Sequence, residues 1–121
     1  MICKPPCGIR TAELYGQIDR CEIARRPDTE AMCAALRDSD APAVGKALCN
    51  VFQPPAIERY GQIGQICESV MRSGACGAQM TGSGSAVFGV FDDREAALRC
   101  SAALRKEYSF ACVAEPVGPL L

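Results

Sequence analysis

Apolar residues recur at helical spacing through much of the first seventy positions of the chain. The clearest early case covers residues 11–19, where Leu14, Tyr15 and Ile18 fall on one helical face. Thr11 stands at the start of this segment, and threonine is a favourable N-cap residue. We therefore expect a helix that begins at Thr11 and turns these three side chains to one side.

Three more helices are expected before residue 74. Asp28 and Asp40 can each cap a short helix, and the first of these would turn Leu36 inward. The longest helix should cover residues 54–73, with its two prolines tolerated in the first turn. Its apolar stripe would comprise Ile57, Tyr60, Ile63, Cys67, Val70 and Met71.

The pattern then changes from helical spacing to short strand-like runs. Residues 75–80 and 85–91 read as two strands, the second rich in valine and phenylalanine. Asp92 with Glu95 resembles a capping box that opens a helix. This helix would bury Ala96, Ala97, Cys100 and Leu104. Residues 1–3 and 110–115 complete the set as a strand stub and a last strand, and this order of elements favours an α+β fold with a sheet covered on one face by helices.

Composition narrows the class of protein. The chain has 121 residues and a formal net charge of -1, with 22% charged and 6% aromatic residues. This length favours one domain spanning residues 1–121. The charge balance argues against a nucleic-acid or membrane surface, because both normally require a basic excess. No apolar run is long enough for a transmembrane helix, and the N-terminus has no secretory signal.

Nine cysteines and no histidine set the available side-chain chemistry. The cysteines form no Cys-x-x-Cys pair, so neither a zinc site nor any other metal site is expected. Their number is odd and most occupy positions that suit small apolar residues, so we expect buried thiols in a reducing cytoplasm. Without histidine, the commonest general base near neutral pH is missing.

The strongest local signal is the glycine-rich segment from Thr81 to Gly84, between the two expected strands. It lacks the Gly-Lys-Ser/Thr ending of a Walker loop and does not lead into a helix. One interpretation is a plain hairpin turn. The other is an anion site, since glycines at positions 82 and 84 let backbone N–H groups converge on a phosphate or carboxylate.

A second candidate lies at the start of the first expected helix, in residues 8–15. Helix N-termini bind anions, and Arg10 and the Thr11 hydroxyl stand beside this one. Tyr15, one turn further on, is placed to stack on a planar ring. The alternative is an ordinary N-cap with a core tyrosine. Asn50 reads as a helix C-terminal cap, and no pair of residues in these segments makes a nucleophile and base.

These segments resemble a known family. Residues 77–89 are similar to the third conserved motif of the GHMP kinases. The Ser-Ala-Val-Phe-Gly run from Ser85, together with residues 8–15, resembles the branch of that family that acts on 4-diphosphocytidyl-2-C-methyl-D-erythritol. Asn50-Val51-Phe52 falls where the family has an Asn-x-hydrophobic stretch. The resemblance runs over almost the whole chain.

The resemblance implies a ferredoxin-like C-terminal domain and an ATP-dependent kinase of isoprenoid precursor synthesis. It places Tyr15 on the substrate cytosine and Thr11 near the reacting end of the substrate. Thr81, Gly82, Ser83 and Gly84 would support the phosphate-binding region through backbone N–H groups. Phosphoryl transfer depends mainly on positioning and charge stabilisation, so these contacts matter without supplying the base.

The resemblance also implies what this chain lacks. Nothing matches the family's ATP phosphate loop, its lysine or its catalytic aspartate, so we expect an N-terminal domain outside this chain to supply them, with ATP and Mg²⁺. The chain alone should contain no catalytic residue, bind no cofactor, and self-associate through the bare domain face. Two alternatives stay open: another GHMP kinase of the homoserine or mevalonate type, and a free-standing ferredoxin-like binding module.

Overall fold

A four-stranded antiparallel sheet forms the centre of the molecule, in the order β2-β3-β1-β4. The computed structural model describes residues 1–118. The strands are β1 (Ile2–Lys4), β2 (Gly77–Met80), β3 (Val87–Val90) and β4 (Phe110–Cys112). The expected strand stub is therefore confirmed, and it lies in the middle of the sheet between β3 and β4. The other strands lie within their predicted ranges and are shorter than these ranges.

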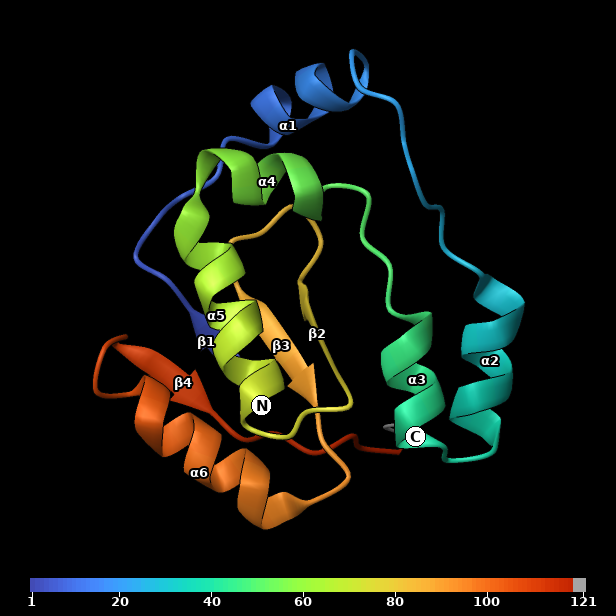
Figure 1. Cartoon of the computed structure of the whole chain (residues 1–121), viewed down its shortest axis with the longest axis vertical. Helices are drawn as coiled ribbons and strands as arrows, with labels where there is room; N and C mark the ends of the chain where they lie inside the picture. Colours follow the sequence, from blue (N-terminus) through green and yellow to red (C-terminus); the bar gives the residue numbers. More distant parts are fainter. Residues whose placement is uncertain (119–121) are drawn as a thin grey trace.

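Six helices pack on one face, one end and one edge of the sheet in the described part of the chain (Figure 1). They are α1 (Thr11–Ile18), α2 (Thr29–Arg37), α3 (Ala41–Ala47), α4 (Gln53–Arg59), α5 (Gly61–Arg72) and α6 (Arg94–Leu104). Helices α5 and α6 cover one face of the sheet, while α1 and α4 lie together at one end of it. Helices α2 and α3 pair beside the edge strand β2. This is the α+β arrangement that the order of elements predicts.

The main core lies between the sheet and helices α5 and α6. Cys3 and Val87 are paired across neighbouring strands and are fully buried against this layer. Val70 of α5 lies so close to Gly89 that a Cβ at Gly89 would collide with it. The four residues predicted to face inward on α6 (Ala96, Ala97, Cys100 and Leu104) are all buried. The capping residue is Asp93 instead of Asp92, and its carboxylate accepts the Glu95 N–H at 2.9 Å.

The predicted long helix over residues 54–73 is wrong in one respect, because it is broken into α4 and α5 at Tyr60. Tyr60 has φ -127° and ψ 77°, which leaves the helical region, and Gly61, a weak helix former, follows it. The break resets the helical phase, so the buried stripe of α5 is Ile63, Ile66 and Val70. Met71, predicted to face inward, is 47% exposed.

Two other inward predictions also fail. Leu36 of α2 is 60% exposed, because α2 packs mainly on α3 and buries only Ala35. The cysteines are all free thiols, yet only Cys3 and Cys100 are buried, and Cys21 and Cys33 are exposed. The aspartate caps of the two short helices are confirmed, with Asp28 and Asp40 each accepting a backbone N–H at 2.9 Å.

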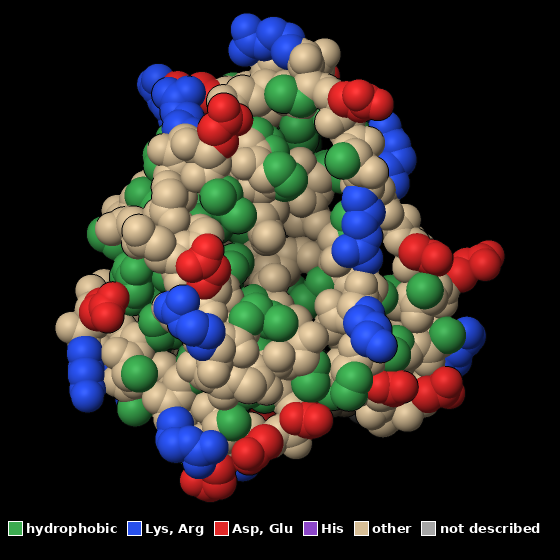
Figure 2. Space-filling model, viewed as in Figure 1, with side chains coloured by type: hydrophobic (Ala, Val, Ile, Leu, Met, Phe, Trp, Pro, Cys, Tyr) green, Lys and Arg blue, Asp and Glu red, His purple; other side chains and the backbone are tan. Residues whose placement is uncertain are grey.

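The surface carries both signs of charge in alternation. Figure 2 shows basic and acidic side chains interspersed around the visible face, with apolar side chains between them. Lys4, at the end of β1, is exposed. The longest helix among residues 1–118 has twelve residues, and none there combines the length and apolar character needed to cross a bilayer.

Candidate functional site

The start of α1 and the β2–β3 loop meet at one end of the sheet. The hydroxyl of Thr11 donates a hydrogen bond to the Ser83 hydroxyl at 3.2 Å, across 72 positions of sequence. Nearby, the Ser85 hydroxyl donates to the Cys7 carbonyl at 2.7 Å. Thr11 was predicted to be the N-cap of α1, and this prediction is wrong. Arg10 occupies the N-cap position, and its side chain makes no capping hydrogen bond. The Thr11 hydroxyl is instead committed to the glycine loop, so the sequence-predicted candidates are brought into contact.

The glycine loop is a tight hairpin connection. Thr81 N–H donates to the Ala86 carbonyl at 2.8 Å, and Gly84 N–H donates to the Thr81 carbonyl at 2.7 Å. Gly82 and Gly84 have φ values of +45° and +88°, which L-residues with a side chain rarely adopt. The hairpin interpretation is therefore correct for the backbone. The N–H groups of Thr81 and Gly84 are thereby used within the turn.

Asn50 holds this loop in place, and its role was missed at the sequence level. Its side-chain amide donates to the carbonyls of Met80 and Gly82 at 2.8 and 2.7 Å, and its side-chain oxygen accepts the Phe52 N–H at 3.0 Å. The prediction of a helix C-terminal cap is wrong, because the preceding helix already ends at Ala47. The side chain instead joins the α3–α4 connection to the end of β2.

Tyr15 presents its ring at the surface of α1. The side chain is 56% exposed, so the alternative of a core tyrosine is wrong. Its ring meets Phe52 edge to face, with centroids 5.0 Å apart and planes at 79°. Phe52 thus fixes one side of the ring, and the remaining ring surface is open to a planar partner.

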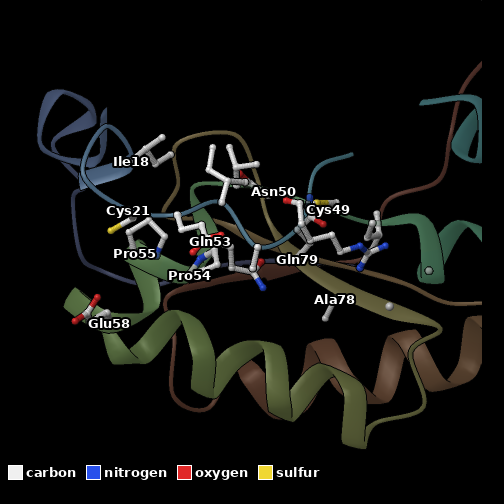
Figure 3. A pocket seen from close by; sticks show the side chains of 18 of the residues that line it. Ile18, Cys21, Cys49, Asn50, Gln53, Pro54, Pro55, Glu58, Ala78 and Gln79 are labelled. Carbon is white, nitrogen blue, oxygen red and sulfur yellow. Dashed lines mark hydrogen bonds between the residues drawn. The ribbon is translucent and has the colours of Figure 1, made fainter. Parts of the chain in front are cut away.

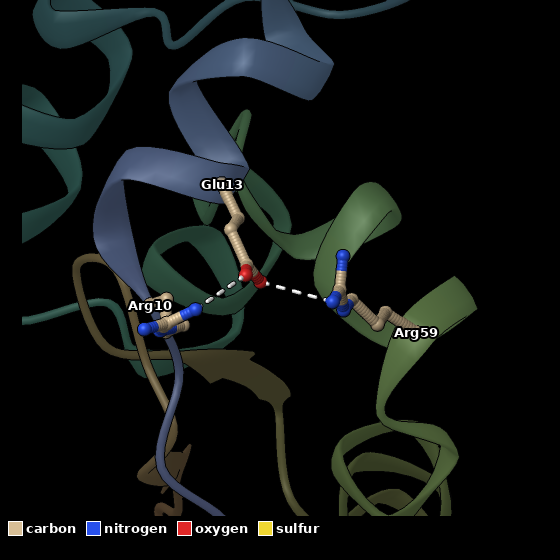
Figure 4. Close-up of polar contacts among 3 residues, drawn as sticks. All are labelled: Arg10, Glu13 and Arg59. Atoms are coloured by element: carbon tan, nitrogen blue, oxygen red, sulfur yellow. Dashed lines mark hydrogen bonds and ion pairs between the residues drawn. The ribbon is translucent and has the colours of Figure 1, made fainter.

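An ion-pair bridge anchors α1 to α4 (Figure 4). The Glu13 carboxylate contacts Arg59 of α4 at 3.1 Å and Arg10 at 3.4 Å. The Arg59 guanidinium also lies 6.0 Å from the centre of the Tyr60 ring. The Arg10 side chain is 82% exposed, so it retains donors for an anion approaching the N-terminus of α1.

Two thiols of the hydrophobic core have raised pKa values. Burial raises the pKa of the Cys3 thiol to about 11, and burial likewise raises the pKa of Cys67 to about 11, so both stay protonated near neutral pH. Within residues 1–118 no group of three histidine, cysteine, aspartate or glutamate side chains is placed to hold a metal ion. The arrangement is suited to holding a ligand.

A separate cavity of about 680 Å³ opens beside the edge strand β2 (Figure 3). Asn50 and Gln53 line it, together with the prolines of α4. Thr11, Tyr15 and residues 81–84 do not line this cavity. The cavity is therefore a second feature, separate from the contact between Thr11 and the glycine loop.

Comparison with known proteins identifies the family. The family model described as "GHMP kinases C terminal" matches residues 32–109. Among curated relatives, the 4-diphosphocytidyl-2-C-methyl-D-erythritol kinase of Clostridium novyi is 36% identical over 109 residues, which is 90% of this chain and 39% of that protein. The enzyme of the same name from Symbiobacterium thermophilum is 41% identical over 97 residues, or 79% of this chain and 34% of that protein.

Solved structures agree on the fold. The crystal structure of a 4-(cytidine 5'-diphospho)-2C-methyl-D-erythritol kinase superposes with a TM-score of 0.70 at 24% identity, covering 88% of this chain and 38% of that one. Homoserine kinase from Cytophaga hutchinsonii gives a TM-score of 0.67 at 18% identity, covering 87% and 35%. The chain thus spans well under half the length of the relatives that it matches. By its sequence match and its fold, this chain belongs to the GHMP kinase family and corresponds to the C-terminal domain of that family.

Proposed function

We propose that this chain is the C-terminal, substrate-binding domain of an ATP-dependent kinase acting on 4-diphosphocytidyl-2-C-methyl-D-erythritol. The complete enzyme would transfer the γ-phosphoryl group to the 2-hydroxyl of that substrate, a step of the MEP pathway to isoprenoid precursors. Residues 1–121 would form one domain of it, acting in the cytoplasm. Support comes from curated relatives of that name at 36% and 41% identity. The observation that carries the proposal is the hydrogen bond between Thr11 and Ser83, which joins the two segments that the family resemblance singles out.

In this proposal the exposed face of Tyr15 stacks on the cytosine ring, with Phe52 supporting the tyrosine from its other side. Thr11 lies near the reacting end of the substrate. Thr81 and Gly84 use their N–H groups to hold the loop, and the N–H groups of Gly82 and Ser83, which donate no hydrogen bond within the described residues, stabilise negative charge on the phosphates. These contacts orient the substrate, which is where phosphoryl transfer gains most of its rate.

The remaining parts would come from an N-terminal domain. It would provide the ATP phosphate loop, the lysine and the catalytic aspartate. Mg²⁺ would also be held there, together with the ATP phosphates. The chain alone is then expected to release no ADP from ATP, with or without the substrate. Substrate-dependent turnover by the isolated chain would contradict this division of roles.

A chimera tests the proposed substrate. This chain would replace the matching 109-residue segment of the Clostridium novyi relative, and ADP release would be followed with each of two acceptors. We expect turnover with 4-diphosphocytidyl-2-C-methyl-D-erythritol and none with homoserine. A preference for homoserine would assign the chain to the homoserine kinases, one of which also superposes on it in structure.

Substitutions in the same chimera test the role of Tyr15. Tyr15→Ala should raise KM for the substrate about tenfold or more, since loss of one aromatic–base stack costs about 1–3 kcal/mol. Tyr15→Phe keeps the stacking surface and should leave KM nearly unchanged. Equal effects of the two substitutions would remove the stacking role.

A further inference from the structure

The cavity beside β2 is separate from the proposed substrate site. It lies between strand β2 and helices α3 and α4, under the connection that leads from Ile18 past Cys21 to Arg25. Figure 3 shows Pro54 and Pro55 on its wall and Gln79 reaching across it. Its volume of about 680 Å³ lies within the range of roughly 300–1,000 Å³ that is typical of small-molecule pockets.

The floor of this cavity is the free edge of a sheet. Strand β2 ends the strand order, so one side of its backbone has no neighbouring strand. In an antiparallel strand, alternate residues turn both their N–H and C=O toward that free side. Met80 is one such residue, and both of its groups are satisfied by side chains: its N–H donates to Gln53 at 2.7 Å, and its carbonyl accepts from Asn50 at 2.8 Å.

Ala78 is the next residue on the same free edge. Its cross-strand partner is Gly89, whose N–H and C=O both bond to Met1 on the opposite side, at 2.9 and 3.1 Å. The Ala78 N–H and C=O therefore point away from β3, toward the cavity that Ala78 lines. Among the described residues, no side chain caps this pair as Asn50 and Gln53 cap the pair at Met80. A polar donor–acceptor pair thus lies within an otherwise mainly apolar cavity.

The open edge is only one residue long. On one side, Met80 is occupied by the two side-chain amides. On the other side, Gly77 lies directly against Gly45 of α3, where no Cβ would fit on either residue. An extended peptide needs successive alternate residues to add as a strand. The geometry favours a compact molecule that uses the Ala78 pair alone.

We propose that this cavity binds a small planar molecule that presents a hydrogen-bond acceptor next to a donor, such as a heteroaromatic ring or a cyclic amide. The acceptor atom of the ligand accepts a hydrogen bond from the Ala78 N–H, and the donor group of the ligand donates a hydrogen bond to the Ala78 carbonyl. The prolines of α4 and Leu48, the residue directly after α3, enclose the apolar body of the ligand. Such a pair of adjacent hydrogen bonds fixes the orientation of the ring, because only one orientation of the ligand pairs both groups of the half-buried Ala78.

Two fragments of matched shape test the proposal on the full chain. 7-Azaindole carries the adjacent acceptor and donor, whereas indole keeps the donor and lacks the acceptor. In amide NMR spectra of the ¹⁵N-labelled chain, 7-azaindole should shift the Ala78 resonance, and indole should bind at least about tenfold more weakly. Equal affinity of the two fragments would overturn the proposed hydrogen-bond pair. Saturable binding of an extended tripeptide at Ala78 would overturn the choice of a small ligand.

The thiols give a second readout within the same molecule. Cys49 lines the cavity, whereas Cys33 lies on α2 and is exposed outside it. At twice its Kd, 7-azaindole should slow alkylation of Cys49 by iodoacetamide about threefold and leave Cys33 unchanged. Mass spectrometry measures both rates in one sample. Equal slowing at the two thiols, or no slowing at Cys49, would count against occupation of the cavity.

Two substitutions locate the binding. Ala78→Pro removes the N–H that faces the cavity without removing a bond of the sheet, and it should weaken 7-azaindole binding about tenfold. Val51→Trp fills the cavity from the α3–α4 connection and should abolish binding. It provides an independent test if the proline variant does not fold. Unchanged affinity in a folded Val51→Trp chain would place the fragment elsewhere and overturn the proposal.

Discussion

Asn50 connects two parts of the chain through a single side chain. Its amide donates to two carbonyls at the end of β2, and its oxygen accepts the N–H of Phe52, which in turn supports Tyr15. A carboxamide is required for this pattern, because a carboxylate accepts hydrogen bonds and cannot donate them. The residue therefore couples the glycine loop to the aromatic pair of the proposed substrate site.

Asn50→Asp should lower the free energy of unfolding by about 2 kcal/mol, because it leaves two carbonyls without a donor and adds a charge beside them. Urea unfolding followed by circular dichroism measures the change. Gln62→Glu makes the same amide-to-acid change on an exposed position of α5 and should cost little. Equal midpoints for the two variants would show that the Asn50 bonds contribute nothing to stability.

The raised pKa of the Cys3 thiol leads us to expect that the free energy of unfolding falls at high pH. Burial raises its pKa from 9.0 to about 11, so the folded chain holds this proton more tightly than the unfolded chain does. The stabilisation is complete below pH 9 and is lost as pH rises toward 11, by up to about 2 kcal/mol. Unfolding under reducing conditions at pH 8 and at pH 10.5 measures this difference. In Cys3→Ala the decline should be smaller, and an equal decline in both proteins would contradict the assignment.

Sequence reasoning at the residue scale identified Thr11, Tyr15 and the glycine loop as candidates, and the structure joins Thr11 to that loop. It misassigned Asn50 and the capping role of Thr11, because Asn50 donates to Met80 and Gly82, and Thr11 donates to Ser83, all 30 or more positions away. Local patterns report on neighbours within one helical turn. The available signal was that Asn50 is a polar residue in an irregular connection, two positions before Phe52, where its side chain can bond to nearby backbone groups.

At the scale of elements, the β2–β3 hairpin depends on two glycines in different surroundings. A Cβ at Gly84 would collide with Ile9 and Met80, whereas a Cβ at Gly82 would meet open space. Both residues have positive φ, so both substitutions cost backbone strain. Only at Gly84 does the missing Cβ also let the hairpin lie close to Ile9, in the segment that precedes α1.

Gly84→Ala should therefore destabilise the chain by about 3 kcal/mol or more, and Gly82→Ala by about 1–2 kcal/mol. Thermal unfolding of the two variants beside the unchanged chain gives the comparison. In amide NMR spectra Gly84→Ala should also shift the resonances of residues 8–12, which Gly82→Ala should leave largely in place. Similar effects of both substitutions would mean that contact with Ile9 does not matter.

The predicted elements exist, and the errors concern their boundaries. Asp28 and Asp40 capped their helices as expected because the capping bond is local, spanning three residues. The continuous helix over residues 54–73 failed because apolar spacing alone does not register a break at Tyr60 before a glycine. Met71 and Leu36 were then assigned to the wrong side, because burial depends on which neighbour each helix meets.

At the scale of the whole molecule, the α+β class and the antiparallel sheet followed from the order of the elements. The order of elements along the chain does not give the strand order in the sheet. Strand β1 lies between β3 and β4, and its pairs join residues 84 or more positions apart along the chain. The cavity beside β2 was also beyond reach, because four separate segments enclose it. Its hydrogen-bonding edge depends on strand register, which sequence alone does not specify here.

The sheet face opposite α5 and α6 makes a last prediction about assembly. Residues alternate across a strand, so Ile2 and Phe88, next to the buried pair Cys3 and Val87, point to the other face. A mainly apolar hollow of about 560 Å³ reaches this face, where Ile2, Phe88 and Val90 line it, and it extends to residues 113–116 and to Arg94 and Ala97 of α6. With a net charge of only -1, little electrostatic repulsion opposes contact between two copies at this face.

The isolated chain should therefore form dimers through this face, with an average mass from light scattering that rises with concentration. Phe88→Lys places a charge in the contact and should return the chain to a monomer under the same conditions. Leu36→Lys introduces the same charge at an exposed position on α2 and should leave the dimer intact. If both substitutions dissociate the dimer equally, net charge controls association and the sheet face does not. A monomer at every concentration would mean that the apolar hollow alone is too small to drive association, since a stable interface normally buries about 800 Å² on each partner.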